Sequence, residues 1–276
     1  MYSLPCPADD AAVRQRAWDT PAVARDRLSV WQSASTETDK ARLTAIRAQH
    51  SSDWLFALPI SAFGLRLGDE AIRCAVGQRL GLNICEPHTC PCGASVDAWC
   101  LHGLACKRSA GRSNHHQQLN DLIWRALKRA DIPSTKEPTG LLRGDGKRPD
   151  GLTLVPCQAG KCLTWDATVV DTLASSYVSV TATRVGGAAD AAAERKSLKY
   201  ASITNTHIFV PVAIETLGPI SSQGLSFLME ISNRLATISG DARATSFLFQ
   251  RVSVLIQRFN QIAFRGTFID GNDTEG

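Results

Sequence analysis

Apolar and polar positions recur along this chain with periods that predict both helices and strands. In the first third, Ala, Leu and Arg follow a helical spacing over residues 9–27 and 36–50, and residues 69–80 fit a third helix that Gly81 should end. Pro21 lies inside the first of these stretches, so two helices are expected there rather than one. Residues 1–84 are therefore expected to form a helical connector.

The second half of the chain mixes the two periods. A helix is expected over residues 115–130, with Ser113 or Asn114 as its N-cap, because its Leu and Ile side chains share one face. Strand-like runs follow at 132–137, 152–155, 162–170 and 207–215, and Pro211 in the last run favours an edge strand. Further helices are expected at 188–201, 224–238 and 243–263. This order predicts a mixed α/β domain over residues 113–268, with a short central sheet flanked by helices and a disordered tail at 269–276.

Composition excludes some classes of protein. Hydrophobic residues make up 44% of the 276, which is enough for a substantial core. The sequence contains no apolar run long enough to span a membrane, and the first residues lack the apolar centre of a signal peptide. We therefore expect a nuclear or cytoplasmic protein that is neither secreted nor membrane-bound, with its thiols reduced and able to bind metal.

Charge is distributed unevenly along the chain. The net charge is +4, yet residues 107–148 hold ten Lys/Arg and four Asp/Glu, a local balance of +6. Such a block attracts nucleic acid, although a solvated helix face and loop would have the same composition. Within it, the candidate DNA contacts are Arg112, Lys128, Lys147 and Arg148. Arg251 and Arg258 lie two turns apart on the last helix and either contact a DNA backbone or form a polar face.

Five of the nine cysteines fall within 22 residues, namely Cys85, Cys90, Cys92, Cys100 and Cys106. Cys90 and Cys92 share a tight turn, and His102 and Cys106 are four residues apart, which places them on one face of a helix. A turn pair and a helix pair can complete the tetrahedron that zinc prefers. These four residues are the predicted ligands, with Cys85, His88 and Cys100 as substitutes. The alternative is a group of buried free thiols.

Two acidic residues mark the strands. Asp150 follows Pro149 at the start of one strand, and Asp166 lies within the next. Alternation places Asp166 with Thr168 and Val170 on one face and Trp165 with Ala167 on the other. A buried carboxylate needs a partner, and a Mg²⁺ or Mn²⁺ ion shared by Asp150 and Asp166 would serve. The alternative is two surface aspartates at strand ends.

Several side chains could complete such a site. Lys196 and Lys199, on the helix after these strands, could each stabilise charge on a scissile phosphate, or they could be ordinary solvated lysines. Glu215, at the end of a later strand, is a further active-site candidate that could support Lys199 or the metal. Glu137 and the pair His116 and Asn120 are weaker candidates, for which capping or solvent-facing roles are the alternative.

Taken together, these motifs resemble the C-terminal region of the reverse-transcriptase proteins of site-specific non-LTR retrotransposons. That region joins a Cys-Cys-His-Cys zinc knuckle to a restriction-enzyme-like PD-(D/E)XK endonuclease, and the resemblance extends from Cys90 to about Phe268. Residues 85–112 would be the knuckle. Arg148-Pro149-Asp150 matches the family's basic-Pro-Asp signature, and Asp166 matches its second acid. Lys196 or Lys199, ahead of Tyr200, matches the family's catalytic lysine, which has moved from the strand to a helix. The resemblance implies a Mg²⁺-dependent endonuclease that nicks double-stranded DNA, with the element's RNA as a second candidate partner.

The chain departs from this pattern in two respects. Thr168 stands where the family ordinarily has its lysine, two residues after the second acid, and the sequence has no Tyr-x-Asp-Asp or Phe-x-Asp-Asp polymerase motif. The polymerase portion is thus absent from this chain. Two alternatives stay open: a catalytically inactive, zinc-containing nucleic-acid-binding protein derived from such an element, and a thiol enzyme in which Cys157 or Cys162 acts with His207.

Overall fold

A four-stranded sheet in the order β3-β4-β5-β6 forms the centre of the structure. It is seen in a computed structural model that describes residues 15–106, 108, 111–141, 148–157 and 159–268, with only the backbone described at 15–16 and 111–114. The strands are β3 (Ser134–Lys136), β4 (Gly151–Thr153), β5 (Leu163–Val170) and β6 (Ile208–Glu215). Strand β4 is antiparallel to both of its neighbours, β3 and β5, whereas β6 runs parallel to β5.

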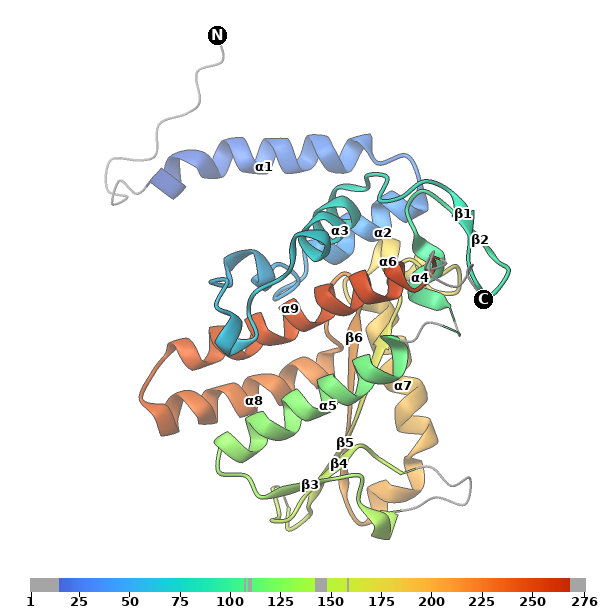
Figure 1. Cartoon of the computed structure of the whole chain (residues 1–276). Coiled ribbons are helices and arrows are strands. Elements are labelled where there is room, and N and C mark those ends of the chain that lie inside the picture. Colours follow the sequence, from blue (N-terminus) through green and yellow to red (C-terminus); the bar gives the residue numbers. More distant parts are fainter. Residues whose placement is uncertain (1–14, 107, 109–110, 142–147, 158, 269–276) are drawn as a thin grey trace.

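Helices cover both faces of this sheet (Figure 1). On one side lie α5 (Gly111–Arg129), α8 (Ser222–Ser239) and α9 (Arg243–Arg265), and on the other lies α7 (Gly187–Lys199), which with α6 (Val178–Thr183) connects β5 to β6. Side chains alternate along β5 as predicted: Trp165 and Ala167 pack in the core beneath α5 and α8, while Val170 contacts the alanines of α7. The mixed α/β class predicted from the sequence is confirmed.

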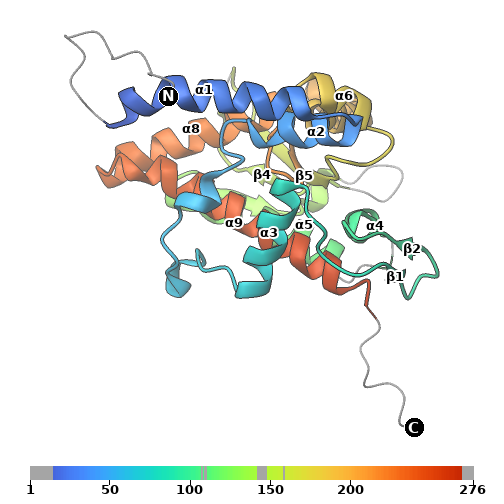
Figure 2. The same ribbon diagram turned by 90° about the horizontal axis from the view of Figure 1, so that it is seen from above.

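The N-terminal third is helical, and the segments that follow its first helix pack on this core (Figure 2). It contains α1 (Gln15–Ser33), α2 (Glu37–Ile46), α3 (Asp69–Leu80) and the short 3-10 turns η1 (Asp53–Phe56) and η2 (Ser61–Phe63). Helix α2 lies against α6, and α3 and η1 lie against α9. Trp54, Leu65 and Leu67 form a small core there with Val254 of α9. Among the described helices, none has the length and apolar character that crossing a bilayer requires.

The prediction that Pro21 separates two helices is wrong, because α1 continues through it. A proline removes one backbone hydrogen bond, and the turns that follow it can still propagate the helix. Pro211 lies on β6, which is an end strand of the sheet, as its sequence suggested. The predicted caps Ser113 and Asn114, the side chain of Arg112, residue Lys147 and the tail at 269–276 lie outside what the structure describes.

The cysteine-rich segment forms a separate small unit beside the end of α9. It consists of a hairpin of β1 (His88–Thr89) and β2 (Ser95–Val96), followed by the short helix α4 (Leu101–Ala105). Gly103 lets α4 approach α9 closely, because a Cβ at that position would lie 2.9 Å from the Ala263 carbonyl oxygen. Two further 3-10 turns, η3 (Thr139–Leu141) and η4 (Ala201–Asn205), flank the sheet elsewhere.

Replacing Gly151 should destabilise the sheet at the point that positions Asp150. A Cβ at residue 151 would overlap the indole ring of Trp165, which is fully buried. We expect Gly151→Ala to lower the free energy of unfolding by about 2–3 kcal/mol, as overpacked cores commonly do. Gly140→Ala is the matched control, because a Cβ there meets nothing within 4 Å. Equal midpoints for both variants in urea denaturation would contradict this account.

Candidate active-site cluster and metal centre

Asp150 is held where β4 stops pairing with β5. Its backbone N–H donates to the carbonyl of Trp165, which is also the register partner of Gly151, so the pairing slips by one residue while Asp150 stays against β5. Beyond that point the Asp150 carboxylate takes the place of a neighbouring strand, accepting a hydrogen bond of 2.6 Å from the backbone N–H of Ala167. The carboxylate is therefore fixed at the edge of β5.

Helix α5 holds the same residue from the other side. Asn120 accepts a hydrogen bond from the indole N–H of Trp165 and donates through Nδ2 to the Asp150 carbonyl. One turn earlier, His116 Nε2 lies 3.0 Å from Asp150 Oδ2, and this hydrogen bond raises the pKa of His116 above its usual value. The sequence had singled out both residues only as weak candidates, and the structure brings both to Asp150.

Asp166 is buried on the face of β5 that α7 covers. Its Oδ1 accepts a hydrogen bond of 3.0 Å from the Tyr200 hydroxyl, and its Oδ2 forms an ion pair with Lys196. Burial raises the pKa of Asp166, and the nearby negative charge of Asp150 raises it further. The two carboxylates predicted to form a pair are thus close enough to influence each other electrostatically.

The structure distinguishes between the two candidate lysines. Lys196 is half-buried and pairs with Asp166, whereas the Lys199 ammonium lies 5.1 Å from the centre of the Tyr200 ring. Tyr200 itself is buried and also hydrogen-bonds the Arg148 carbonyl at 2.9 Å, so it ties the segment before Asp150 to Asp166. Its role was not recognised from the sequence, although its spacing of four from Lys196 places the two on one helix face.

Glu215 does not join this cluster. In the parallel register it lies beside Val170, four residues along β5 from Asp166, and its Oε1 accepts hydrogen bonds from the N–H groups of Ala188 and Ala189. It therefore caps the N-terminus of α7. Burial raises its pKa to about 7. Among the described residues, the hydrogen bonds of Glu215 that are seen go to α7, and the predicted support of Lys199 or of a metal at Asp150 stays a prediction.

The residues predicted to contact DNA have different partners in the structure. Arg148 forms an ion pair with Glu137 beside the cluster, and the Lys128 ammonium lies 4.1 Å from the centre of the Trp124 ring. Arg258 donates to the carbonyls of Gly64 and Arg66, so it fastens the N-terminal layer to α9. Its contact with a DNA backbone stays a prediction.

Arg251 is half-buried near Phe247, on the same side of α9 as Arg258. Burial lowers its pKa, and the charges of Arg129 and Arg125 lower it further. The arginines of this region therefore form a basic area at the junction of α5 and α9.

The thiol alternative finds no support in the described contacts. The Cys157 thiol lies 3.4 Å from the Thr153 hydroxyl, whereas the imidazole of His207 hydrogen-bonds Thr206 at 2.8 Å. A thiolate nucleophile ordinarily needs a nearby cation or imidazole, so the geometry favours the carboxylate cluster as the candidate reactive centre.

The cysteine-rich segment brings together the four predicted zinc ligands. The ligand atoms of Cys90, Cys92, His102 and Cys106 all lie within 4.8 Å of one another. The Cys90 and Cys106 sulfurs are 3.9 Å apart, close to the roughly 3.7 Å expected between two thiolates of a tetrahedral zinc site. These residues therefore form a Cys₃His cluster that could hold a structural zinc ion.

The three substitute ligands have other partners. Cys100 lies 3.6 Å from the Thr267 hydroxyl, His88 Nε2 lies 2.9 Å from the same hydroxyl, and the Cys85 thiol contacts the Asp97 carbonyl at 3.3 Å. Burial raises the pKa of Cys100 to about 12, whereas a hydrogen bond from the Ala94 backbone lowers that of Cys92 to about 7. A lowered pKa suits a thiolate ligand.

Zinc content should distinguish ligands from neighbours. We expect about one zinc ion per chain, with Cys92→Ser losing it and Cys100→Ser, the matched control, retaining it. Elemental analysis of purified protein measures this directly. Chelation should also lower the melting temperature of the wild type, because metal binding contributes to folding. Full zinc content in Cys92→Ser would show that the ligand set is different.

Glu215 should make stability fall as pH rises. Its folded pKa of about 7 lies above the ordinary value of 4.5, so the folded state holds the proton more tightly. Its contribution is fully present below about pH 4.5 and is lost as the pH passes about 7. Relative to wild type, Glu215→Gln should gain on the order of 2 kcal/mol between those limits. Glu194→Gln, on the same helix and exposed, is the control, and parallel pH profiles for wild type and Glu215→Gln would contradict the assignment.

The chain matches no protein-family model and no curated protein.

Proposed function

We propose that this chain is a metal-dependent DNA endonuclease with a PD-(D/E)XK-type core. The observation that carries the proposal is the juxtaposition of Asp150 and Asp166 at the edge of β5, next to Lys196. Two carboxylates and an ammonium group at one sheet edge are the groups that metal-assisted phosphodiester hydrolysis requires. The cluster is carried by α5, the strands β4 and β5, and the helix α7 that precedes the parallel strand β6.

The donor set suits a hard divalent cation. Mg²⁺ binds through one or two carboxylates and keeps water and substrate phosphate as its other ligands. Asp150 and Asp166 offer that number, and each raises the electrostatic cost of the other's charge, which a cation would offset. When bound, the ion would polarise the phosphate and increase the acidity of a water molecule.

The protein's own residues orient and balance the carboxylates. Asn120 and the Ala167 backbone fix Asp150, while Tyr200 fixes Asp166. Lys196 lies on the α7 side of the pair and His116 on the α5 side. With DNA bound, Lys196 would exchange part of its ion pair with Asp166 for the negatively charged phosphate, since an ammonium group stabilises charge that develops in the transition state.

Nucleic acid is the proposed substrate because basic residues lie along the elements that position the cluster. Arg148 precedes Asp150, and exposed Lys136 and Lys128 extend from the same sheet edge and α5 around Trp124. Sequence-independent contacts with a DNA backbone come mainly from such residues. Proteins that lost catalysis would keep this charge but would have no need to keep both buried carboxylates.

A plasmid-nicking assay tests the proposal. With Mg²⁺, the wild type should convert supercoiled DNA to the nicked form, and EDTA should abolish this. Asp150→Asn, Asp166→Asn and Lys196→Met should each lower the rate by at least about 100-fold, since each removes a group that holds the ion or stabilises charge.

Lys199→Met is the matched control for Lys196→Met, because Lys199 lies three residues away and outside the ion pair with Asp166. It should retain nicking within about threefold of wild type. If all the variants nick DNA equally, the activity comes from another site or a contaminant. DNA binding by a wild type that never nicks would favour the non-catalytic alternative.

A further inference from the structure

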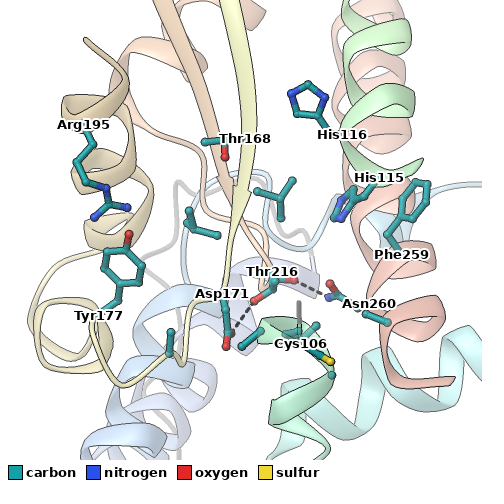
Figure 3. A pocket seen from close by; sticks show the side chains of 17 residues that line it. Cys106, His115, His116, Thr168, Asp171, Tyr177, Arg195, Thr216, Phe259 and Asn260 are labelled. Atoms are coloured by element: carbon teal, nitrogen blue, oxygen red, sulfur yellow. Dashed lines mark hydrogen bonds between the residues drawn. The ribbon is translucent and has the colours of Figure 1, made fainter. Parts of the chain in front are cut away.

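A pocket opens next to the candidate catalytic cluster, along the edge of β5 that β4 leaves uncovered (Figure 3). Its volume is about 400 Å³, which lies in the range of small-ligand sites. His116 and Thr168 line the end nearest Asp150, and helix α4 of the cysteine cluster forms part of the wall. The pocket therefore lies between the two sites already described, and it shares His116 with the first and Cys106 with the second.

One wall of the pocket is aromatic. The imidazole of His115 stacks on the ring of Phe259, with centroids 4.4 Å apart and planes inclined by 13°. Burial lowers the pKa of His115 to about 4, so this ring is neutral at ordinary pH. Across the opening lie Tyr177 and Arg195, whose guanidinium carbon is 5.1 Å from the centre of the Tyr177 ring (Figure 3).

Buried polar atoms face the same space. Asn260 is 2% exposed, and its Nδ2 donates to the Thr216 carbonyl at 2.8 Å. Its Oδ1 has no hydrogen-bond partner among the described residues, and the same holds for the buried Nε2 of His115. An unsatisfied buried acceptor costs free energy unless a bound group or water supplies a donor. Both atoms therefore point to a polar ligand with its own donors and acceptors.

We propose that this pocket receives an unpaired nucleobase of the DNA strand that lies at the catalytic cluster. The inference rests on the proposed function and adds to it the form of the substrate. A base is flat enough to stack on His115 or Tyr177 and carries ring nitrogens and exocyclic groups that can reach Asn260. Arg195, exposed on α7, is placed to contact the adjoining phosphate.

The chemistry of the wall favours a base over other ligands. An anion alone would leave the aromatic face and Asn260 unused, whereas a purely apolar ligand would leave the polar atoms unsatisfied. Stacking on aromatic side chains together with hydrogen bonds to base edges is how proteins recognise unstacked bases. Thus the enzyme should prefer DNA with a locally unpaired nucleotide near the cleavage position.

The test measures binding in a buffer that contains Ca²⁺ in place of Mg²⁺ and no chelator, so that cleavage plays no part and the cysteine cluster keeps its metal. Two short duplexes are compared by fluorescence anisotropy: one carries a single bulged nucleotide, and the other carries an abasic residue at the same position. The backbone is the same in both, so the difference reports the base alone. Wild type should bind the bulged nucleotide at least about fivefold more tightly, the lower end of what stacking on an aromatic side chain contributes. Equal affinities would overturn the proposal.

Two variants locate the effect. Ala174 lines the pocket, so Ala174→Leu should remove the preference while leaving affinity for the abasic duplex within about twofold, and Ala201→Leu, at an exposed site outside the pocket, should keep it. Should Ala174→Leu fail to fold, Tyr177→Leu provides the same comparison. A preference that persists when the pocket is filled would also overturn the proposal.

The outcomes separate this proposal from the nuclease proposal. Base preference without nicking in Mg²⁺ would remove the catalytic function and support the pocket. Nicking without a base preference would support the catalytic function and overturn the proposal that the pocket binds a base.

Discussion

The whole site depends on how Asp150 replaces a strand at the edge of β5. Its N–H donates to the Trp165 carbonyl, and its carboxylate then accepts the Ala167 N–H that a longer β4 would have bound. Because both ends of the residue are tied to β5, the carboxylate cannot leave without exposing a buried backbone donor, which is costly. This constraint keeps two acidic side chains adjacent despite their mutual repulsion.

The same early end of β4 creates the space beside the cluster. Where pairing stops, β5 borders a pocket closed by α5 and α9 on one side and by α7 and the segment that precedes α6 on the other. The cysteine cluster contributes through α4, which Gly103 allows to lie close to α9. A zinc ion there would stabilise one wall of the pocket without taking part in chemistry, as structural zinc sites do.

The positive charge at the site comes from a helix rather than from the strand. Thr168 lies on the same face of β5 as Asp166, but the ammonium that reaches Asp166 belongs to Lys196 of α7. This is feasible because small alanines on α7 bring the helix close to β5 and β6, so a long side chain near its C-terminal end can return to the sheet. Tyr200, four residues on, completes the contact and connects it to the Arg148 carbonyl.

Local spacing alone determined the ligand set of the cysteine cluster, the alternation along β5 and the mixed α/β class. Each depends on neighbours within a turn or a strand, where backbone geometry fixes which side chains share a face. Only the tertiary structure could show that Lys196 rather than Lys199 pairs with Asp166, and that His116 and Asn120 reach Asp150. The same holds for Glu215 at the N-terminus of α7 and for the hydrogen bonds of Arg258 to backbone carbonyls of the N-terminal third. These outcomes depend on the distance between elements far apart in sequence, which is set by packing and which periodicity does not encode.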